Sequence, residues 1–331
     1  MKTAVFSSHK FEKPFLEQAN NSRHEMHFLN VKLSLETAML SAGFEAASLF
    51  VSDDASAEIL EILHQQGIRF IALRSAGFNN IDLAKAEQLG IRVARVPAYS
   101  PFAVAEHAVA LMLALNRKLI RAHNRVMEQN FSLDGLTGFD MNGKTVGIIG
   151  TGKIGVVIAR ILHGFGCRLL AFDKEENEEI KQKFNVEYLD CKSLCSQSDI
   201  ITLHVPLNEH TRYLINKSCI ECMKPGVMLI NTSRGGLVNT KDVTQALKNE
   251  QIGYFGMDVY EEEEGLFFED HSEDILQDDT IARLMTFRNV LITSHQGFLT
   301  ETALKNISET TINNLDCFEK NIICENEITI K

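Results

Sequence analysis

The stretch TVGIIGTGKIG, residues 145–155, decides the fold. An apolar run at its start, Thr145–Ile149, ends in a turn that carries Gly150 and Gly152, and a helical pattern follows from Gly155. Gly150 permits a tight turn, Gly152 lets the backbone approach a ligand closely, and Gly155 lets the helix pack against the strand. Because the first amides of such a helix bind phosphates, the stretch predicts a site for the pyrophosphate of a dinucleotide.

The acidic residue Asp173 indicates which dinucleotide binds. It follows a second apolar run, Leu169–Phe172, and lies eighteen residues after Gly155. A carboxylate at this position typically binds the adenosine ribose and repels a 2′-phosphate, so we predict NAD rather than NADP. A strand-end Asp can also cap the helix that follows it, and this alternative stays open.

Short β-branched runs alternate with amphipathic helical stretches along the chain, which predicts parallel α/β sheets. The expected strands are Thr3–Phe6, Ala47–Val51, Arg69–Leu73, Arg92–Ala94, Thr145–Ile149, Leu169–Phe172, Ile200–Leu203, Val227–Ile230, Tyr254–Met257 and Val290–Thr293. Two longer helices are expected, one capped by Ser100 and running over residues 102–128, the other running from Thr300 to about Glu319. These helices bracket an inserted block, so we predict a discontinuous domain of residues 1–100 and 300–331, and a second domain of residues 101–299.

Composition narrows the class of protein. The 331 residues are 45% hydrophobic and 23% charged, typical of globular domains, and 33 basic against 44 acidic residues give a net charge of −11, which argues against nucleic-acid binding. Neither a signal peptide nor an apolar run of membrane-spanning length is visible, so we expect a cytoplasmic protein. The seven cysteines are scattered, and the motif Cys219-Ile-Glu-Cys222 lacks a second ligand pair, so we expect no metal.

Three further segments follow predicted strands and carry one chemically distinctive residue each. They are INTSRGG (residues 230–236) with Arg234, GMDVYEEE (256–263) with Glu263, and TSHQGF (293–298) with His295. Reduction of a 2-oxo acid needs a cation to bind the carboxylate, a proton donor for the carbonyl oxygen, and an acid that orients the donor. Each residue alone is more typical of a surface loop. Their joint occurrence behind a dinucleotide motif predicts an active site.

At these residues the sequence resembles the D-isomer-specific 2-hydroxyacid dehydrogenase family, over essentially the whole chain. It most resembles the fermentative D-lactate dehydrogenase branch, through the segments ALRSAGFNNID (72–82), VPAYS (96–100), LTGF (136–139) and NTSRG (231–235). The resemblance implies a Rossmann-type NAD domain inserted into a flavodoxin-like substrate domain. It also implies an NAD-dependent oxidoreductase that acts on the CH–OH group of 2-hydroxy acids, reducing pyruvate to D-lactate in fermentation, as a homodimer or homotetramer.

The resemblance also implies roles for individual residues. Arg234 would bind and orient the substrate, His295 would donate the proton, and Glu263, the last Glu of a D-V-Y-E-x-E pattern, would pair with the histidine. Within the homogeneous run 261–264 this register is open by one residue. Residues that resemble substrate contacts are Gly77, Phe78, Tyr99, Arg234, His295 and Phe298. Residues that resemble cofactor contacts are Gly150, Gly152, Lys153, Ile154, Gly155, Asp173, Val205, Pro206, Thr232, Ser233, Arg234 and Asp258.

The aromatic residues Tyr99, Phe298 and Phe102 would crowd the substrate pocket, which favours pyruvate over a branched or phosphorylated acid. Two alternatives stay open at this point. One is a dehydrogenase of the same family that acts on a bulkier 2-oxo acid. The other is an NAD-sensing binding protein on the same fold, which the presence of Arg234, Glu263 and His295 does not exclude. Contacts between subunits are expected through the helical region 101–128.

Overall fold

The computed structural model describes residues 1–329 and divides the chain into two compact units. Unit 1 comprises Met1–Ser100 and Leu299–Lys331, and unit 2 comprises Pro101–Phe298. Each unit contains its own parallel β-sheet. No helix within residues 1–329 is both long and apolar enough to cross a membrane.

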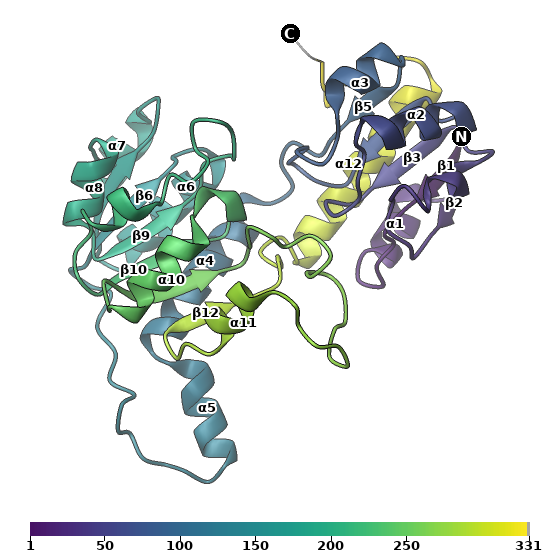
Figure 1. Cartoon of the computed structure of the whole chain (residues 1–331). Helices are drawn as coiled ribbons and strands as arrows, with labels where there is room; N and C mark the ends of the chain where they lie inside the picture. The colour runs from purple at the N-terminus through teal and green to yellow at the C-terminus, as the bar shows by residue number, and fades with distance from the viewer. Residues whose placement is uncertain (330–331) are drawn as a thin grey trace. The chain divides into compact units, whose positions relative to one another are not determined.

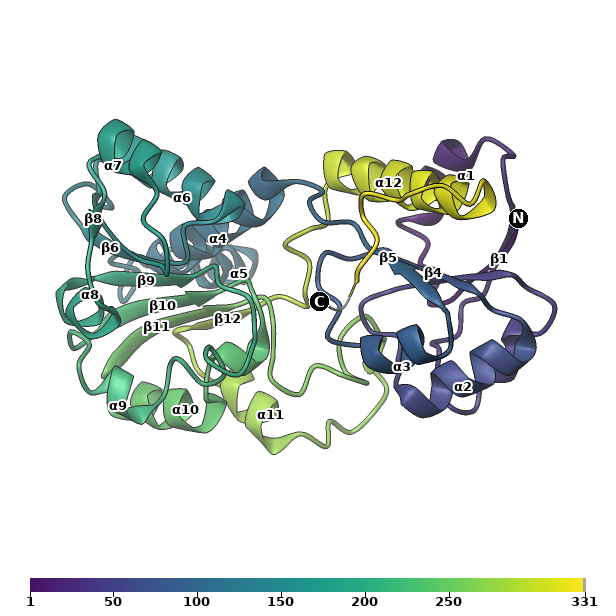
Figure 2. The same cartoon turned by 90° about the horizontal axis from the view of Figure 1, so that it is seen from above.

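Unit 1 is built on a five-stranded parallel sheet in the order β2-β1-β3-β4-β5, the order of flavodoxin-like folds. Helices α1 and α12 cover one face of the sheet, and α2 and α3 cover the other (Figure 2). The elements are β1 (Lys2–Val5), α1 (Lys13–Asn20), β2 (Glu25–Phe28), η1 (Ala38–Ser41), β3 (Ala46–Leu49), α2 (Ala57–Gln66), β4 (Phe70–Leu73), α3 (Leu83–Gln88), β5 (Arg92–Ala94) and α12 (Glu301–Glu319).

Unit 2 is built on a seven-stranded parallel sheet in the order β12-β11-β10-β9-β6-β7-β8. Numbered within the unit, six of these strands follow the dinucleotide-binding order 3-2-1-4-5-6. The strands are β6 (Thr145–Ile149), β7 (Arg168–Phe172), β8 (Glu187–Tyr188), β9 (Ile200–Leu203), β10 (Val227–Asn231), β11 (Ile252–Met257) and β12 (Val290–Ile292). The helices are α4 (Pro101–Asn116), α5 (Leu119–Met127), α6 (Lys153–Gly164), α7 (Glu178–Phe184), α8 (Cys191–Gln197), α9 (Lys217–Ile220), η2 (Gly235–Leu237), α10 (Thr240–Lys248) and α11 (Asp279–Met285). Two doubly covered parallel sheets confirm the predicted fold class.

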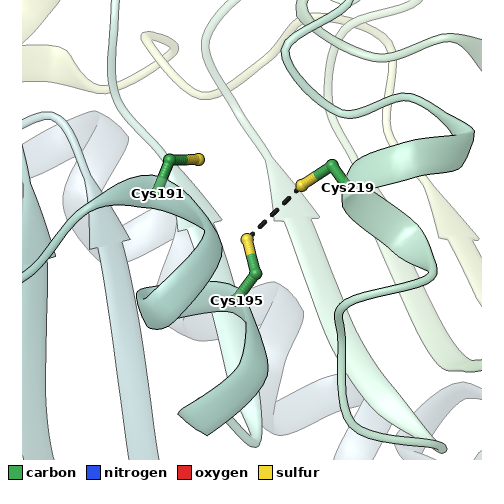
Figure 3. A group of neighbouring side chains, drawn as sticks. All are labelled: Cys191, Cys195 and Cys219. Carbon is green, nitrogen blue, oxygen red and sulfur yellow. Dashed lines mark hydrogen bonds between the residues drawn. The ribbon is translucent and has the colours of Figure 1, made fainter.

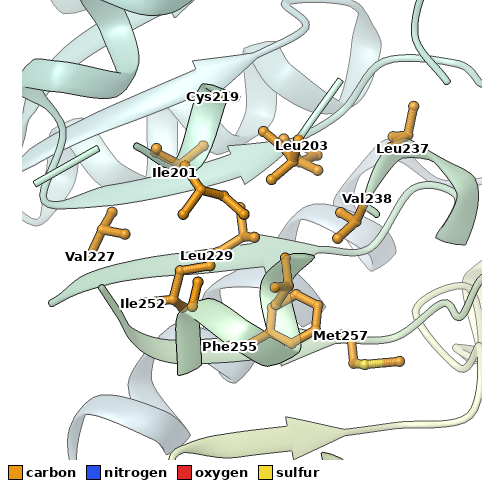
Figure 4. Packing of buried hydrophobic residues seen from close by; sticks show 14 of the residues in the cluster. Ile201, Leu203, Cys219, Val227, Leu229, Leu237, Val238, Ile252, Phe255 and Met257 are labelled. Carbon is orange, nitrogen blue, oxygen red and sulfur yellow. The ribbon is translucent and has the colours of Figure 1, made fainter. Parts of the chain in front are cut away.

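The central strands of unit 2 are buried on both faces, which explains their continuous apolar runs. All five residues of β10 are buried, and so are all four of β9. On one face Leu229 packs with Ile201, Leu203 and Phe255 (Figure 4). On the other face the core includes residues of α4 and α6. A rigid central sheet of this kind fixes the positions of the loops at its strand ends.

One predicted helix was wrong in its extent. Residues 102–128 form two helices rather than one, because Lys118 adopts a left-handed conformation with φ 52° between α4 and α5. At the end of α4, the side chain of Asn116 hydrogen-bonds both the backbone carbonyl and the backbone amide of Phe139. No residue of α5 is buried, and α5 and the segment after it extend away from the sheet of unit 2 (Figure 1).

Two strands were missed, and both lie at sheet edges. β2 and β8 each pair with one neighbour only and alternate exposed with partly buried residues. Edge strands of this kind carry polar side chains, so their hydrophobic signal is weak. The predicted start of the last helix was right, since Thr300 caps α12 by accepting a hydrogen bond from the Ala303 amide at 3.2 Å.

Candidate active site

The glycine-rich turn joins β6 to α6, and its three glycines meet different surroundings. A Cβ on Gly155 would lie 2.0 Å from the Gly150 carbonyl oxygen, and Gly150 itself has φ +100° and lies against the His204 backbone. The fold therefore requires glycine at both positions. A Cβ on Gly152 would meet nothing within 4 Å, so open space lies at the first turn of α6, beside Lys153 and Ile154. This space and the amides facing it fit a pyrophosphate.

Asp173 lies at the end of β7 and holds the glycine turn. Its Oδ2 accepts hydrogen bonds from the Thr151 amide at 2.6 Å and from the Thr151 hydroxyl at 3.1 Å. The residue that caps the next helix, α7, is Asn177, so the capping alternative for Asp173 is excluded. The carboxylate thus lies next to the turn expected to hold the phosphates, where a ribose hydroxyl can reach it.

The loops after β9 and β10 lie side by side at the same edge of the sheet. The Ser233 hydroxyl donates a hydrogen bond to the Val205 carbonyl at 2.7 Å and so joins the two loops, next to Pro206. The Thr232 hydroxyl is buried without a hydrogen-bond partner in the described structure. A buried, unpaired hydroxyl is costly unless a ligand satisfies it. The residues at this edge therefore fit a bound dinucleotide.

His295 and Glu263 meet across two loops of unit 2. The imidazole Nδ1 lies 2.9 Å from Glu263 Oε1, and the two side chains are 13% and 25% exposed. Glu263 Oε2 accepts a hydrogen bond from the Tyr260 amide at 3.0 Å, which fixes the carboxylate. His295 has φ 52°, a conformation that non-glycine residues rarely adopt, and its amide donates to the Asp258 carbonyl at 2.6 Å. His295 is thus held both at its backbone amide and at its imidazole ring.

The glutamates of the acidic run 261–264 make different contacts. Glu261 hydrogen-bonds the Tyr213 hydroxyl and accepts from the Thr240 amide, so its carboxylate is engaged away from the histidine. Glu263 is the member of the run whose carboxylate contacts His295. This contact agrees with the register that the family resemblance implies, and the catalytic role of Glu263 stays a prediction.

Arg234 lies in the loop after β10, directly before η2, and the backbone beside it packs closely on the acidic segment. Its Nη1 donates to the Ser233 carbonyl at 2.7 Å. A Cβ on Gly235 would lie 2.0 Å from the Tyr260 carbonyl carbon, so only glycine allows this approach. The loop that carries Arg234 therefore lies against the segment that leads into Glu263.

Asp258 organises the histidine loop through contacts that sequence reasoning did not predict. This residue is 1% exposed and accepts hydrogen bonds from the Thr293 hydroxyl at 2.6 Å and from the amides of Gln296 and Gly297 at 2.8 Å each. His107 of α4 lies 3.2 Å from the same carboxylate. Burial opposes the charged form of Asp258, but the hydrogen bonds from His107 and Thr293 hold its pKa below the ordinary value.

The contacts of His107 with the histidine loop were missed by the sequence analysis. Its Nε2 also lies 3.0 Å from the Thr293 hydroxyl, 186 positions away along the chain. The available signal was a histidine within an otherwise apolar helical segment. That signal does not identify a distant partner, so only the fold shows the contact.

The remaining predicted substrate contacts lie in two different units. Phe298 ends unit 2, whereas Gly77, Phe78 and Tyr99 belong to unit 1. The Gly77 carbonyl accepts from the Ser75 hydroxyl at 2.7 Å, and the Tyr99 carbonyl accepts from the Asn306 amide group at 2.6 Å. Both loops of unit 1 are therefore held by side-chain to backbone hydrogen bonds.

A buried ion pair supports the first of these loops. Arg74, 2% exposed, follows β4 and pairs with both carboxylate oxygens of Glu12 at 3.0 and 3.1 Å. Its guanidinium also donates to the carbonyls of Ser48 and Phe6. Arg74 thus connects the ends of β1, β3 and β4. No local sequence pattern predicts this ion pair.

Comparison with known proteins identifies the family. Residues 109–297 match the model of the D-isomer specific 2-hydroxyacid dehydrogenase, NAD binding domain. The chain belongs to the D-isomer-specific 2-hydroxyacid dehydrogenase family. It is 51% identical over 329 residues to a protein named D-lactate dehydrogenase from Escherichia coli strain K12, covering 99% of this chain and 100% of the relative.

Solved structures of family members have the same fold. The apo-structure of D-lactate dehydrogenase from Escherichia coli matches with a TM-score of 0.90 at 48% identity, covering 99% of this chain and 100% of that one. The pyruvate reductase of Chlamydomonas reinhardtii matches with a TM-score of 0.93 at 43% identity, covering 98% of each chain. The chain is therefore an NAD-dependent oxidoreductase of 2-hydroxy acids, and the predicted family, enzyme class and cofactor are confirmed.

Proposed function

We propose that this dehydrogenase interconverts pyruvate and D-lactate, with His295, Glu263 and Arg234 as its catalytic residues. The observation that carries the assignment of residues is the 2.9 Å contact between His295 Nδ1 and Glu263 Oε1, at the sheet edge where the glycine turn lies. The choice of substrate is supported by the relative from Escherichia coli named D-lactate dehydrogenase and by the structural relative described as a pyruvate reductase.

His295 has the contacts of a proton donor. Glu263 engages Nδ1, so Nε2 is the nitrogen that gives its proton to the carbonyl oxygen of pyruvate. The adjacent carboxylate stabilises the imidazolium before transfer and fixes the orientation of the ring. In the reverse direction, the neutral imidazole takes the proton from the hydroxyl of D-lactate.

Arg234 is suited to bind the substrate carboxylate. Its guanidinium is always charged and presents paired N–H groups to paired oxygens, which orients the acid and polarises the neighbouring carbonyl. The hydrogen bond from Nη1 to the Ser233 carbonyl holds one side of the guanidinium in place. Tyr99, Phe298 and the backbone at Gly77 and Phe78 would complete the substrate contacts.

NAD, when bound, supplies or accepts the hydride at C2 of the substrate. The residues of unit 2 bind and orient it. The amides at Gly152, Lys153 and Ile154 would hold the pyrophosphate, and Asp173 would accept hydrogen bonds from the adenosine ribose. Val205, Pro206, Thr232, Ser233 and Asp258 would line the rest of the site.

The test is the loss of NADH absorbance with pyruvate, 2-oxobutyrate, 2-oxoisocaproate, phenylpyruvate, glyoxylate and hydroxypyruvate, followed by the chirality of the product. We expect the highest kcat/KM with pyruvate and D-lactate as the product. A preference for a bulky acid would keep the mechanism and overturn the argument that Tyr99, Phe298 and Phe102 crowd the pocket. Formation of L-lactate would overturn the proposed stereochemistry.

We also propose that the chain forms a homodimer or homotetramer through the region of α5. Leu119, Ile120, Val126 and Met127 are each at least half exposed, and Phe131 and Leu133 after the helix are 72% and 80% exposed. Apolar side chains this concentrated on one extended segment indicate a contact with a second copy of the chain. Sedimentation of wild type and of Ile120→Lys with Met127→Lys tests this, since the double variant should be monomeric.

A cytoplasmic location stays a prediction, to be tested by cell fractionation.

A further inference from the structure

Three cysteine sulfurs of unit 2 lie close together, and none of the three cysteines is among the residues assigned to catalysis or to cofactor binding. Cys191 and Cys195 lie one turn apart on α8, so their side chains leave the same face of that helix. Cys219 faces them from α9 (Figure 3). The Sγ atoms of Cys195 and Cys219 are 3.4 Å apart, and all three sulfurs lie within 4.8 Å of one another. Two separate helices thus bring three soft ligand atoms together.

The cluster is shielded but not closed. Cys195 is 0% exposed and Cys219 is 8% exposed, whereas Cys191 is only partly buried and gives access from solvent. Apolar side chains of the same core, Leu194 and Ile220, flank the sulfurs. A site with a buried interior and one accessible ligand allows an ion to enter and then excludes competing water.

We propose that Cys191, Cys195 and Cys219 form a binding site for one soft metal ion, Cu(I), coordinated by three sulfurs. Thiolates select Cu(I) and Zn(II) over harder ions. Structural zinc almost always takes four ligands, whereas the cluster found within residues 1–329 has three. An ion about 2.3 Å from each of three sulfurs places the sulfurs about 4 Å apart, within the range that the structure shows. Each thiol that becomes a ligand releases its proton, and no electron is transferred.

The structure also separates this site from the Cys219-Ile-Glu-Cys222 motif. The Cys222 thiol donates to the Ser218 carbonyl at 3.3 Å and does not belong to the cluster. The motif that drew attention in the sequence is therefore not the ligand pair. Cys222 instead provides a matched control, because it is a partly buried cysteine near the cluster.

The experiment titrates reduced, full-length protein with Cu(I) in the absence of oxygen, against a chromophoric Cu(I) chelator. Wild type and Cys222→Ser should each bind one tightly held ion per chain, and X-ray absorption should show sulfur neighbours at about 2.3 Å. Cys191→Ser should lose this binding while keeping the circular dichroism of wild type. Equal binding by Cys191→Ser, or loss of binding in Cys222→Ser, would overturn the proposal. So would a preference for Zn(II) with four sulfur neighbours.

A second measurement needs no variant. Iodoacetamide labelling of wild type, read by peptide mapping, should modify Cys191 in the metal-free protein and spare it once Cu(I) is bound. Cys222 and Cys317, which are partly buried, should be labelled to the same extent in both states. Unchanged labelling of Cys191, or a Cys195–Cys219 disulfide in place of bound copper, would contradict the site.

Discussion

His295 Nδ1 lies 2.9 Å from Glu263 Oε1, although 32 positions separate the two residues along the chain. The contact depends on the order of the sheet, because β11 leads into the loop with Glu263 and β12, its neighbour, leads into the loop with His295. Parallel neighbouring strands end at the same edge, so their following loops meet. The strand order of the sheet therefore brings the Glu263 carboxylate next to the His295 imidazole.

Replacing Glu263 with Gln should lower kcat for pyruvate reduction by about a hundredfold, within the range typical of acid–base groups. The amide keeps the size of the side chain but no longer carries the charge that faces the imidazole and fixes its orientation. Steady-state rates of NADH oxidation at pH 7 measure the loss. Glu262→Gln is the matched control and should keep wild-type rates.

Replacing His295 with Gln should reduce kcat much further while leaving the dissociation constant of NADH within about threefold of wild type. The reason is that the imidazole supplies the proton and is not needed to hold the dinucleotide. Fluorescence titration with NADH and turnover assays separate the two quantities. His163→Gln, an exposed histidine on α6, serves as control. Wild-type turnover in His295→Gln would remove this residue as the acid.

Asp173→Asn should raise the affinity for NADPH relative to NADH by about tenfold, because the charge that repels a 2′-phosphate is removed. The Asn side chain keeps one oxygen to accept from the Thr151 amide, so the turn should survive. Binding constants for both dinucleotides test this, with the exposed Glu175→Gln as control. An unchanged ratio of the two constants would show that Asp173 does not set the preference.

The glycine turn and the strand-end loops could be predicted because their signals are local. A strand, the three glycines of the motif and the start of a helix lie within residues 145–155, and each later loop directly follows an apolar run. The register of the acidic run is less certain from sequence, because four identical residues carry no local signal and only the family resemblance points to Glu263. In the structure Glu263 contacts His295, whereas Tyr213 engages Glu261 from a distant loop.

Most of the structural features that the sequence analysis missed depend on contacts between segments far apart in the chain. His107 meets Thr293 across 186 positions, and Cys195 meets Cys219 from a different helix. Neither pair has a spacing that marks it in a single sequence. The break at Lys118 was also missed; it lies beside a tertiary contact, since the side chain of Asn116 bonds the backbone of Phe139.

Substitution of Gly155 and of Gly152 by alanine should have different effects on the protein. Gly155→Ala forces a Cβ to within 2.0 Å of the Gly150 carbonyl oxygen, so it should destabilise the fold by roughly 3 kcal/mol or prevent folding. Gly152→Ala meets nothing within 4 Å and has an ordinary φ of −68°, so the fold should be unaffected. Its methyl group should instead occupy space needed by the pyrophosphate and weaken NADH binding. Thermal unfolding without cofactor and NADH titration distinguish the two, and equal stability losses would contradict the argument.

Asp258→Asn should cost roughly 3 kcal/mol of stability at pH 7, because a buried carboxylate that accepts from Thr293 and from the amides of Gln296 and Gly297 loses its charge. The pKa of Asp258 is held below its ordinary value of 3.8 despite its burial, through the hydrogen bonds from His107 and Thr293. A depressed pKa means that the folded state binds the proton less readily than the unfolded state. The stabilisation is therefore fully present above about pH 4 and is lost as the pH falls through the folded pKa.

The difference in unfolding free energy between wild type and Asp258→Asn should accordingly stay constant from pH 7 to about pH 5 and shrink below pH 4. Urea unfolding at these pH values measures it. Asp279→Asn, an exposed acid on α11, should show little difference from wild type at any pH. A difference for Asp258→Asn that grew on acidification would mean that the carboxylate is protonated in the folded protein, contrary to the four donors that surround it. Because the same carboxylate holds the loop of His295, the stability loss should be accompanied by a fall in kcat at pH 7.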